Sequence, residues 1–185
     1  THPFARVMPR RAQATCARLG LPYLRLLRPG WSPQTGDRWT FVRDAEATAA
    51  AIPGGVRVLL ATGARSVSDF AGLARGRHLI ARVIDPPRAP FPFSQGEWWV
   101  ARPPFEVEDE VAGFTARRVD VVVAKNAGGK ADAKLAAARR LGLPVVLLER
   151  PAPPPGDRVE GVAAALGRDV ADVDGLSELR GLEFE

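Results

Sequence analysis

From residue 56 onward, four short runs of apolar residues have the length and spacing of buried strands. They cover residues 56–61, 79–84, 119–124 and 145–148, and most of them are almost continuous apolar stretches such as Val-Asp-Val-Val-Val-Ala. Such runs are typical of parallel strands whose two faces are both covered by helices. Segments with a helical pattern separate them, at residues 66–73, 106–118 and 130–141. The alternation predicts a doubly wound, Rossmann-like α/β domain.

The first thirty residues carry a different pattern. Residues 4–19 place their apolar side chains close to a 3.6-residue period, which predicts an amphipathic helix that ends at Gly20. Residues 22–27 then have the pattern of a short strand before the turn Pro29-Gly30. In an α/β protein such a helix normally follows a parallel strand, and no strand pattern precedes this one. We therefore expect residue 1 to be an interior point of a larger domain.

Together these patterns predict two Rossmann-like parallel-sheet domains, the first of them incomplete in this chain. Residues 1–31 would be the end of the N-terminal domain. Residues 32–55 would be a connecting segment, with a short apolar run at 39–42 and an alanine-rich helix at 44–52. The C-terminal domain would cover residues 56–166 and close with a helix near 159–166, after the proline-rich stretch 151–155. Residues 167–185 would form a tail.

The composition narrows the class of protein. The 185 residues are 46% hydrophobic and 25% charged, as in ordinary globular domains. No apolar stretch approaches the roughly 18 residues of a membrane span, so we expect no membrane partner. The only cysteine, Cys16, is expected to be a small buried side chain, and its isolation fits a reducing, cytoplasmic setting.

The charge points to an anionic partner without identifying it. The net charge is +5, but the arginines alternate with acidic residues, and no basic run with interleaved aromatics indicates nucleic acid. No His and Cys residues stand at the spacing of a metal site. The sequence therefore predicts neither nucleic acid nor metal as a ligand.

Ligands of open α/β sheets bind beyond the carboxyl ends of the strands, where helix N-termini present unsatisfied N–H groups. After the strand at 56–61 comes a turn in which Gly63 permits positive backbone angles, and Ser66 with Asp69 resembles a capping box. Thr62 and Arg65 add a hydroxyl and a guanidinium that suit a carboxylate or a phosphate. A plain strand-to-helix turn explains the same residues equally well.

The loop after the strand at 119–124 reads Lys-Asn-Ala-Gly-Gly-Lys. The adjacent Gly128 and Gly129 let the backbone approach a ligand closely, while Lys125 and Asn126 supply donors at the same strand end. The loop matches neither the Walker motif nor G-x-G-x-x-G. It predicts a site for an anionic ligand, with a merely structural loop as the alternative.

A long segment between residues 85 and 105 lacks a clear pattern, and loops of this length are often functional. It carries Trp98, Trp99, Arg102 and Phe105, which suit a flat anionic macrocycle. The alternative is that the tryptophan pair forms a short strand that covers the sheet edge.

The chain has two histidines, and neither has a partner at the spacing of nucleophilic catalysis. His78 precedes a strand and is expected to be structural. His2 lies at an inferred strand end and helix start, where a cofactor could lie. A cofactor contact and a structural role stay open for it.

Several short motifs, taken in order, resemble the precorrin-6A reductases. Thr-His-Pro-Phe-Ala opens the chain, and Lys-Asn-Ala-Gly-Gly follows the strand at 119–124. Two positions depart from the family pattern. Ala61 stands where the family often has Thr, and Ala127 stands where it often has Ser, so this chain lacks two hydroxyl donors. The matching segments are residues 1–5, 27–31, 62–65, 82 with 85–87, 104–108, 125–129, 134–135 and 141–146.

The resemblance implies an NADPH-dependent oxidoreductase of cobalamin biosynthesis that reduces precorrin-6A to precorrin-6B by hydride transfer to the macrocycle. It implies that the polycarboxylate corrin precursor binds mainly to the C-terminal domain. Neighbouring pathway enzymes, from or to which the substrate could be transferred, are further candidate partners. Lys125 is the best guess for a catalytic side chain. The substrate-binding residues would be Thr62, Gly63, Arg65, Arg82, Lys125, Asn126, Gly128 and Gly129, and the cofactor-binding residues Thr1, His2 and Phe4.

The family's N-terminal glycine-rich turn, its main dinucleotide contact, has no counterpart in this sequence. We therefore expect the chain to be a fragment or one part of a longer polypeptide. A non-catalytic binding module for an anionic tetrapyrrole or nucleotide is the main alternative function. An unrelated Rossmann-like transferase is the third.

Overall fold

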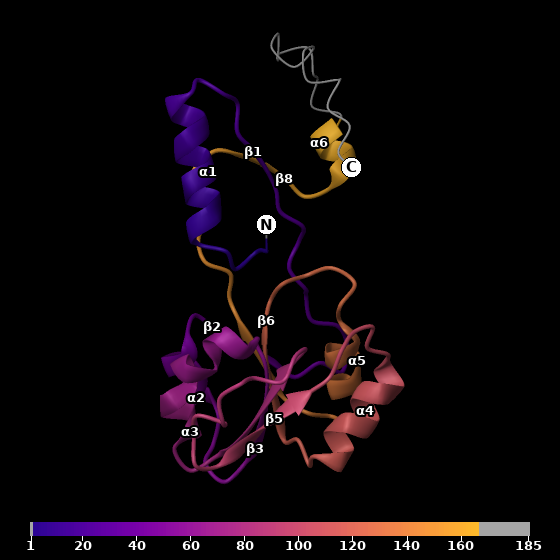
Figure 1. Cartoon of the computed structure of the whole chain (residues 1–185). Helices are drawn as coiled ribbons and strands as arrows, with labels where there is room; N and C mark the ends of the chain where they lie inside the picture. Colours follow the sequence, from indigo (N-terminus) through magenta and orange to yellow (C-terminus); the bar gives the residue numbers. More distant parts are fainter. Residues whose placement is uncertain (1, 167–185) are drawn as a thin grey trace. The chain divides into compact units, whose positions relative to one another are not determined.

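The computed structural model describes residues 2–166, which form two compact units (Figure 1). The larger unit is Gly30–Arg150, and the smaller unit combines the segment up to Pro29 with the segment from Pro151. Thr1 and the predicted tail at 167–185 lie outside the described residues. Within residues 2–166, no helix has the length and apolar character needed to cross a membrane.

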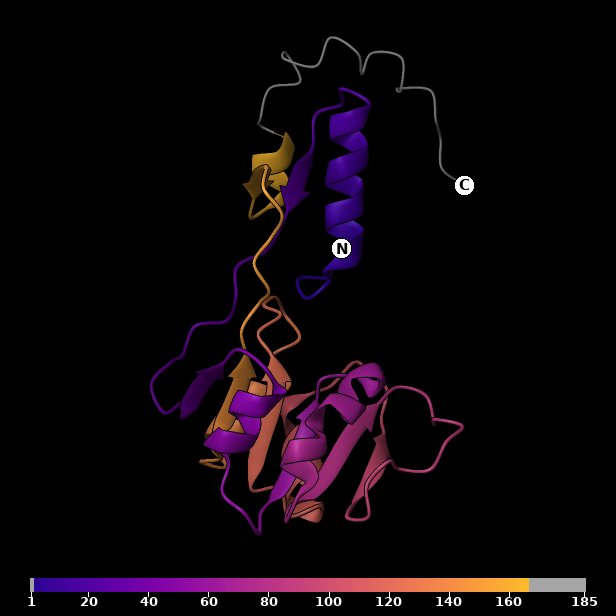
Figure 2. The same ribbon diagram turned by 90° about the vertical axis from the view of Figure 1, so that its left-hand side faces the viewer.

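The larger unit is built on a sheet of six parallel strands in the order β2-β7-β6-β3-β4-β5 (Figure 2). In the centre, Val58 pairs with Val121 and Leu60 with Val123, and these side chains are buried. The structure confirms the predicted α/β fold with a parallel sheet. The strands are β2 (Trp39–Val42), β3 (Arg57–Ala61), β4 (His78–Val83), β5 (Gly96–Val100), β6 (Val121–Lys125) and β7 (Val145–Leu148).

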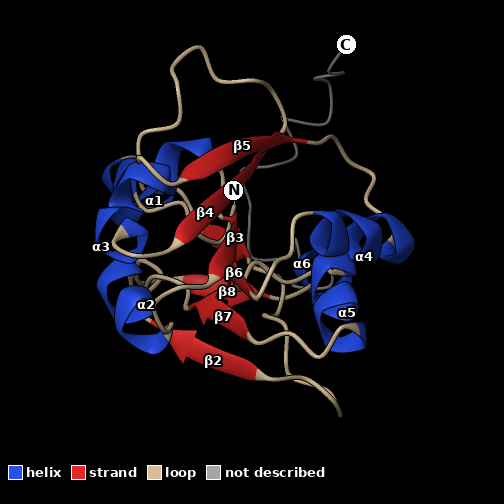
Figure 3. Ribbon diagram, turned by 90° about the horizontal axis from the view of Figure 1, so that it is seen from below, coloured by secondary structure: helices blue, strands red, loops and turns tan. Residues whose placement is uncertain are grey.

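Helices cover both faces of this sheet (Figure 3). One face carries α2 (Ala45–Ala51), the 3₁₀-helix η1 (Ala64–Phe70) and α3 (Ala71–Ala74), and the other carries α4 (Val107–Ala116) and α5 (Ala133–Arg140). Each central strand is therefore buried on both sides, which explains why its sequence is apolar without alternation.

The order of the strands creates a switch point at the centre of the sheet. The chain steps from β3 to β4 in one direction along the sheet, and from β6 to β7 in the other. The connections that leave the neighbouring strands β3 and β6 therefore diverge onto opposite faces. A crevice at the carboxyl ends of such strands is where open α/β sheets bind ligands.

Three details of the larger unit differ from the sequence prediction. Strand β2 pairs with β7, so residues 39–51 belong to the sheet and its helix layer and do not form a separate connection. Gly96–Val100 forms edge strand β5, which is the alternative left open for the tryptophan pair. The helix expected at residues 66–73 begins at Ala64 as a 3₁₀-helix and becomes α-helical only from Ala71.

The smaller unit contains α1 (Val7–Arg18), β1 (Leu24–Leu26), β8 (Asp157–Val159) and α6 (Val162–Leu166). The predicted first helix and strand are confirmed. Residues 151–166 belong to this unit and not to the C-terminal domain as predicted, because β8 forms a parallel pair with β1. The Leu27 N–H extends this pairing by donating to the Val159 carbonyl over 2.8 Å. Cys16 is half-buried, so the expectation of a fully buried thiol is wrong.

Candidate functional site

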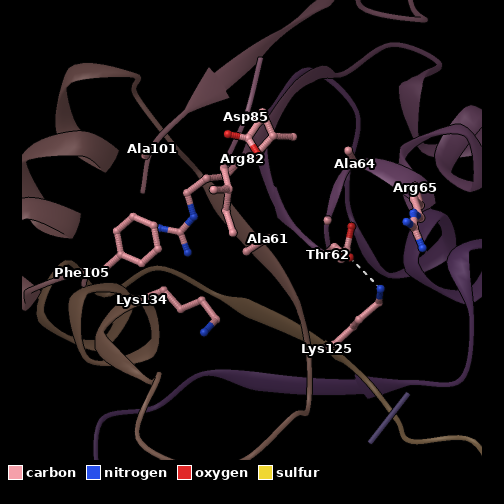
Figure 4. Close-up of a pocket in the computed structure, with 13 residues that line it drawn as sticks. Ala61, Thr62, Ala64, Arg65, Arg82, Asp85, Ala101, Phe105, Lys125 and Lys134 are labelled. Atoms are coloured by element: carbon pink, nitrogen blue, oxygen red, sulfur yellow. Dashed lines mark hydrogen bonds between the residues drawn. The ribbon is translucent and has the colours of Figure 1, made fainter. Parts of the chain in front are cut away.

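A cavity of about 660 Å³ opens at the carboxyl edge of the six-stranded sheet, at the switch point (Figure 4). The turn after β3, the end of β4 and the last residue of β6 form its floor, and the segment 101–105 and the first turn of α5 form its wall. Because the strands are parallel, side chains from distant parts of the sequence meet at this edge. The polar side chains that line it are Thr62, Arg65, Arg82, Asp85, Lys125 and Lys134.

The lining is strongly cationic. Four of these side chains carry a positive charge at neutral pH, and Asp85 is the one carboxylate among the lining residues. That carboxylate is already paired, since Arg102 Nη2 lies 2.5 Å from Asp85 Oδ1 on the exposed rim. The cavity therefore attracts an anion, and several separate cations suit a ligand with several carboxylates.

The turn after β3 brings its backbone carbonyls into the site. Gly63 adopts φ +90°, a conformation that an L-residue rarely takes, and no atom lies close to where a Cβ would stand. Ser66 Oγ lies 3.0 Å from the Thr62 carbonyl, from Thr62 Oγ1 and from the Gly63 carbonyl. The predicted capping box with Asp69 does not form, because η1 begins at Ala64 and Ser66 lies inside its first turn.

Arg82 is the most rigidly held cation of the cavity. Its Nη1 donates to both carboxylate oxygens of Glu110 on α4, and the side chains are only 9% and 2% exposed. The guanidinium also lies 4.3 Å from the centre of the Phe105 ring and 5.5 Å from that of Trp99. An ion pair between aromatic rings keeps the planar donor group in one orientation.

The two lysines of the cavity differ in their surroundings. Lys125 Nζ donates to the Thr62 carbonyl at 2.6 Å, and burial lowers its pKa while the nearby Asp69 carboxylate opposes that shift. Burial lowers the pKa of Lys134 to about 8, and the positive charge of Arg82 adds to the effect. Both amines are therefore stronger acids than an exposed lysine.

The loop after β6 is held by contacts with two other segments of the larger unit. Asn126 Oδ1 accepts from the Trp31 N–H at 2.7 Å, and Asn126 Nδ2 donates to the Trp31 carbonyl at 3.3 Å. The Trp31 indole N–H donates to the Gly129 carbonyl at 2.8 Å. Arg150 binds the Asn126 carbonyl at 2.7 Å and the Ala127 carbonyl at 2.9 Å. The loop thus anchors the two segments at which the chain enters and leaves the larger unit.

Five of the predicted substrate-binding residues line the cavity, namely Thr62, Gly63, Arg65, Arg82 and Lys125. Asn126, Gly128 and Gly129 do not, because the loop turns toward Trp31, with positive φ angles of 67° at Gly128 and 82° at Gly129. Of the aromatic residues proposed for a macrocycle, Phe105 lines the cavity. Trp98 and Trp99 pack within edge strand β5, against Phe91 and Phe114 respectively.

The sequence reasoning did not single out Lys134, Glu110 or Trp31 as parts of the site. Lys134 Nζ lies 4.6 Å from the Trp31 ring centre. Glu110 stands in the acidic first turn of α4, where it had the appearance of a helix-dipole residue. The one available signal was that all three lysines of the chain fall between residues 125 and 134.

Of the residues predicted to contact a cofactor, His2 and Phe4 lie in the smaller unit, and Thr1 is outside the described residues. His2 Nδ1 accepts from the Phe4 N–H at 3.2 Å, and the two rings are 5.9 Å apart. His78, at the start of β4, has Nε2 3.5 Å from Glu97 Oε1, far along the strand from the carboxyl edge. Among residues 2–166, no group of three or more His, Cys, Asp and Glu side chains could hold a metal ion.

Comparisons with known proteins agree with this picture. The chain is 44% identical over 167 residues to the precorrin-6A reductase of Rhodobacter capsulatus, which covers 88% of this chain and 66% of that protein. It is 43% identical over 169 residues to the precorrin-6A reductase of Rhodococcus erythropolis, with 90% and 67% covered. The chain thus spans about two thirds of the length of these relatives.

A solved structure and a family model give the same result. The structure, a CobK precorrin-6A reductase, matches with a TM-score of 0.84 at 42% identity and covers 90% of this chain and 69% of its own. The family model of precorrin-6x reductase CbiJ/CobK matches residues 1–168. This chain belongs to the precorrin-6x reductase CbiJ/CobK family.

Proposed function

We propose that the cavity binds the polycarboxylate corrin precursor precorrin-6A and that the protein takes part in its NADPH-dependent reduction to precorrin-6B. The observation that carries the proposal is the convergence of Arg65, Arg82, Lys125 and Lys134 on one cavity whose only lining carboxylate is already paired. The relation to precorrin reductases supports the choice of ligand, because a corrin precursor with several carboxylates fits such a cluster of cations.

The chain's own residues would bind and orient the substrate. Arg82, fixed between Glu110 and Phe105, offers its remaining N–H groups to one carboxylate in a defined direction. Lys125 and Arg65, on the other side of the Thr62 turn, would hold further carboxylates. Contacts distributed around a macrocycle fix its rotation within the site, and such positioning is a large part of what a reductase must supply.

A reduced nicotinamide would supply the hydride, but the described residues do not by themselves form a dinucleotide site. In residues 2–166, the turn before α1 is held by the Ala5 N–H donating to the His2 carbonyl, and α1 begins without a side-chain cap. This turn has no glycine at which a pyrophosphate could approach the backbone. The contacts of the cofactor with Thr1, His2 and Phe4 stay predictions.

A binding module without chemistry is the second candidate, because a cationic cavity is present and a dinucleotide turn is not found among residues 2–166. Anaerobic incubation of the 185-residue chain with precorrin-6A and NADPH separates the two functions. Loss of NADPH absorbance together with formation of the reduced corrinoid supports the reductase. Binding of precorrin-6A without NADPH oxidation supports the module, and absence of binding contradicts both.

The site itself is tested by the double variant Lys125→Ala, Arg65→Ala. Both side chains point away from the apolar core, so we expect an unchanged circular dichroism spectrum. The precorrin-6A affinity should fall by roughly 30- to 900-fold, at about 1–2 kcal/mol for each of the two lost contacts. The matched control replaces Lys130 and Arg88, which are exposed and do not line the cavity. Unchanged affinity in the first variant would remove the proposed site. The cytoplasmic setting and the exchange of substrate with other pathway enzymes stay predictions.

A further inference from the structure

The proposed reduction adds a hydride and a proton to the macrocycle, so the site needs a group that can release a proton near neutral pH. Among the lining residues, Arg65 and Arg82 cannot serve, since a guanidinium does not lose its proton in proteins. Asp85 is paired with Arg102 on the exposed rim, and the Thr62 hydroxyl is far too weak an acid. Lys125 and Lys134 are left.

The distribution of basic residues in the chain gives these lysines weight. Of 26 lysine and arginine residues, three are lysines, and all three lie between the last residue of β6 and the first turn of α5. Elsewhere the described fixed ion pairs and carbonyl contacts use arginine, as in Arg139 with Asp37 and Arg77 with five backbone carbonyls. An amine can change its charge where an arginine cannot.

Lys125 is held as a structural donor. Its Nζ donates to the Thr62 carbonyl at 2.6 Å, which joins the ends of β6 and β3. The Asp69 carboxylate near it favours the protonated form. Both contacts stabilise the ammonium and oppose release of its proton.

Lys134 differs from Lys125 in lying beside a second cation, Arg82, whose positive charge favours loss of its proton. It stands in the first turn of α5, faces the cavity, and directs Nζ to the Ala131 carbonyl at 2.5 Å and to the Trp31 ring at 4.6 Å. The charged groups that face it are Arg82 from β4, Glu110 from α4 and Asp132 before its own helix. Glu110 and Asp132 oppose the lowering of the Lys134 pKa, but burial and the positive charge of Arg82 outweigh them.

The Ala131 carbonyl and the Trp31 ring fix the position of the Lys134 amine. The Trp31 ring beneath Nζ is held by its indole N–H on the Gly129 carbonyl, and the Trp31 backbone by Asn126. This arrangement explains why the Asn126 loop matters to the cavity although it does not line it.

We propose that Lys134 is the proton donor of the reaction, a proposal that rests on the reductase function proposed above. Reduction of a carbon–carbon double bond of the ring adds a hydride to one of its carbons, and a reduced nicotinamide would supply that hydride. The other carbon takes a proton from Lys134 Nζ, so an N–H bond breaks and a C–H bond forms. The hydride donor would be oxidised by two electrons, and the neutral amine would regain its proton from water. A lysine whose pKa is lowered to about 8 is largely protonated at neutral pH and still a competent acid.

The test compares Lys134→Arg with Lys130→Arg. Arginine keeps the charge but cannot donate a proton, so Lys134→Arg should bind precorrin-6A within about threefold of the wild type and lose roughly 100-fold or more in kcat. The wild-type rate should fall as pH rises through about 8, and this limb should vanish in the variant. Lys130→Arg, at an exposed position outside the cavity, should behave as wild type in both respects.

A second measurement does not depend on turnover. Reductive methylation with carbon-13 labels only the three lysines and the N-terminus, and the Lys134→Arg variant assigns its signal. A titration midpoint of Lys134 near the ordinary lysine value overturns the proposal, as does a Lys134→Arg variant with wild-type kcat and pH profile. A wild-type chain that binds precorrin-6A without reducing it overturns the proposed function and the donor role together, whereas an active Lys134→Arg variant overturns only the latter.

Discussion

The ion pair of Arg82 with Glu110 offers a sharp test of how the cavity is built. Glu110→Gln keeps the size of the side chain and removes its charge, which leaves the Arg82 guanidinium without a counter-ion. Breaking a buried pair in this way costs about 3–5 kcal/mol. Glu110 is 2% exposed, but Arg82, at 9%, borders a cavity of about 660 Å³ that admits water. We therefore expect the lower end, about 3 kcal/mol of unfolding free energy.

Urea unfolding of the larger unit measures this loss. With a dependence of about 1–3 kcal/mol per molar urea, the midpoint should fall by about 1–3 M. The matched control is Glu108→Gln on the same helix, whose carboxylate pairs with Arg140 at 3.0 Å between two exposed side chains. That variant should change stability by less than about 0.5 kcal/mol. Equal midpoints for the two glutamine variants would refute the reasoning.

The same variant reports on Lys134. The Glu110 carboxylate opposes the lowering of the Lys134 pKa, so its removal should move that pKa below about 8. Replacing both partners by apolar residues, as in Arg82→Met with Glu110→Leu, should recover most of the lost stability because no buried charge is left alone. This double variant should still bind precorrin-6A more weakly than the wild type, since the fixed Arg82 guanidinium is gone. A double variant as unstable as Glu110→Gln would show that packing and not charge accounts for the loss.

Two further outcomes are expected of residues outside the cavity. Arg77→Met should lower the free energy of unfolding in urea by about 2–3 kcal/mol, because Arg77 binds carbonyls at the ends of α2 and α3. The control Arg75→Met, at an exposed position, should change it little. Similar urea midpoints for the two variants would contradict the role of Arg77. Asn126→Ala removes both hydrogen bonds to the Trp31 backbone and should lower the free energy of unfolding by about 1–2 kcal/mol. It should also speed proteolysis between residues 30 and 38. A cleavage rate equal to that of the wild type would contradict the role of Asn126 as an anchor of this segment.

The strands of the larger unit could be predicted because their information is local. A run such as residues 121–124 is apolar at every position, and only a strand covered on both faces buries all of it. The same local signals placed Thr62, Arg82 and Lys125 at strand ends, and parallel pairing then required these ends to share one edge. Five predicted site residues therefore line the cavity.

Pairings between distant segments were beyond such reasoning. Strand β8 has three residues, and what places it in the smaller unit is its partner β1, which no local pattern names. Asn126 lies in a loop whose composition is typical of a ligand site, yet its side-chain amide hydrogen-bonds to the backbone of Trp31, 95 residues earlier in the chain. Lys134 appeared as one polar position of a helix until Arg82, Glu110 and Trp31 surrounded it. The sequence alone determined which residues stand at the ends of the strands, because burial of each strand is a property of its own side chains. The tertiary structure decided which polar groups satisfy one another and which are left to face a ligand, because that depends on distances that only the folded chain sets.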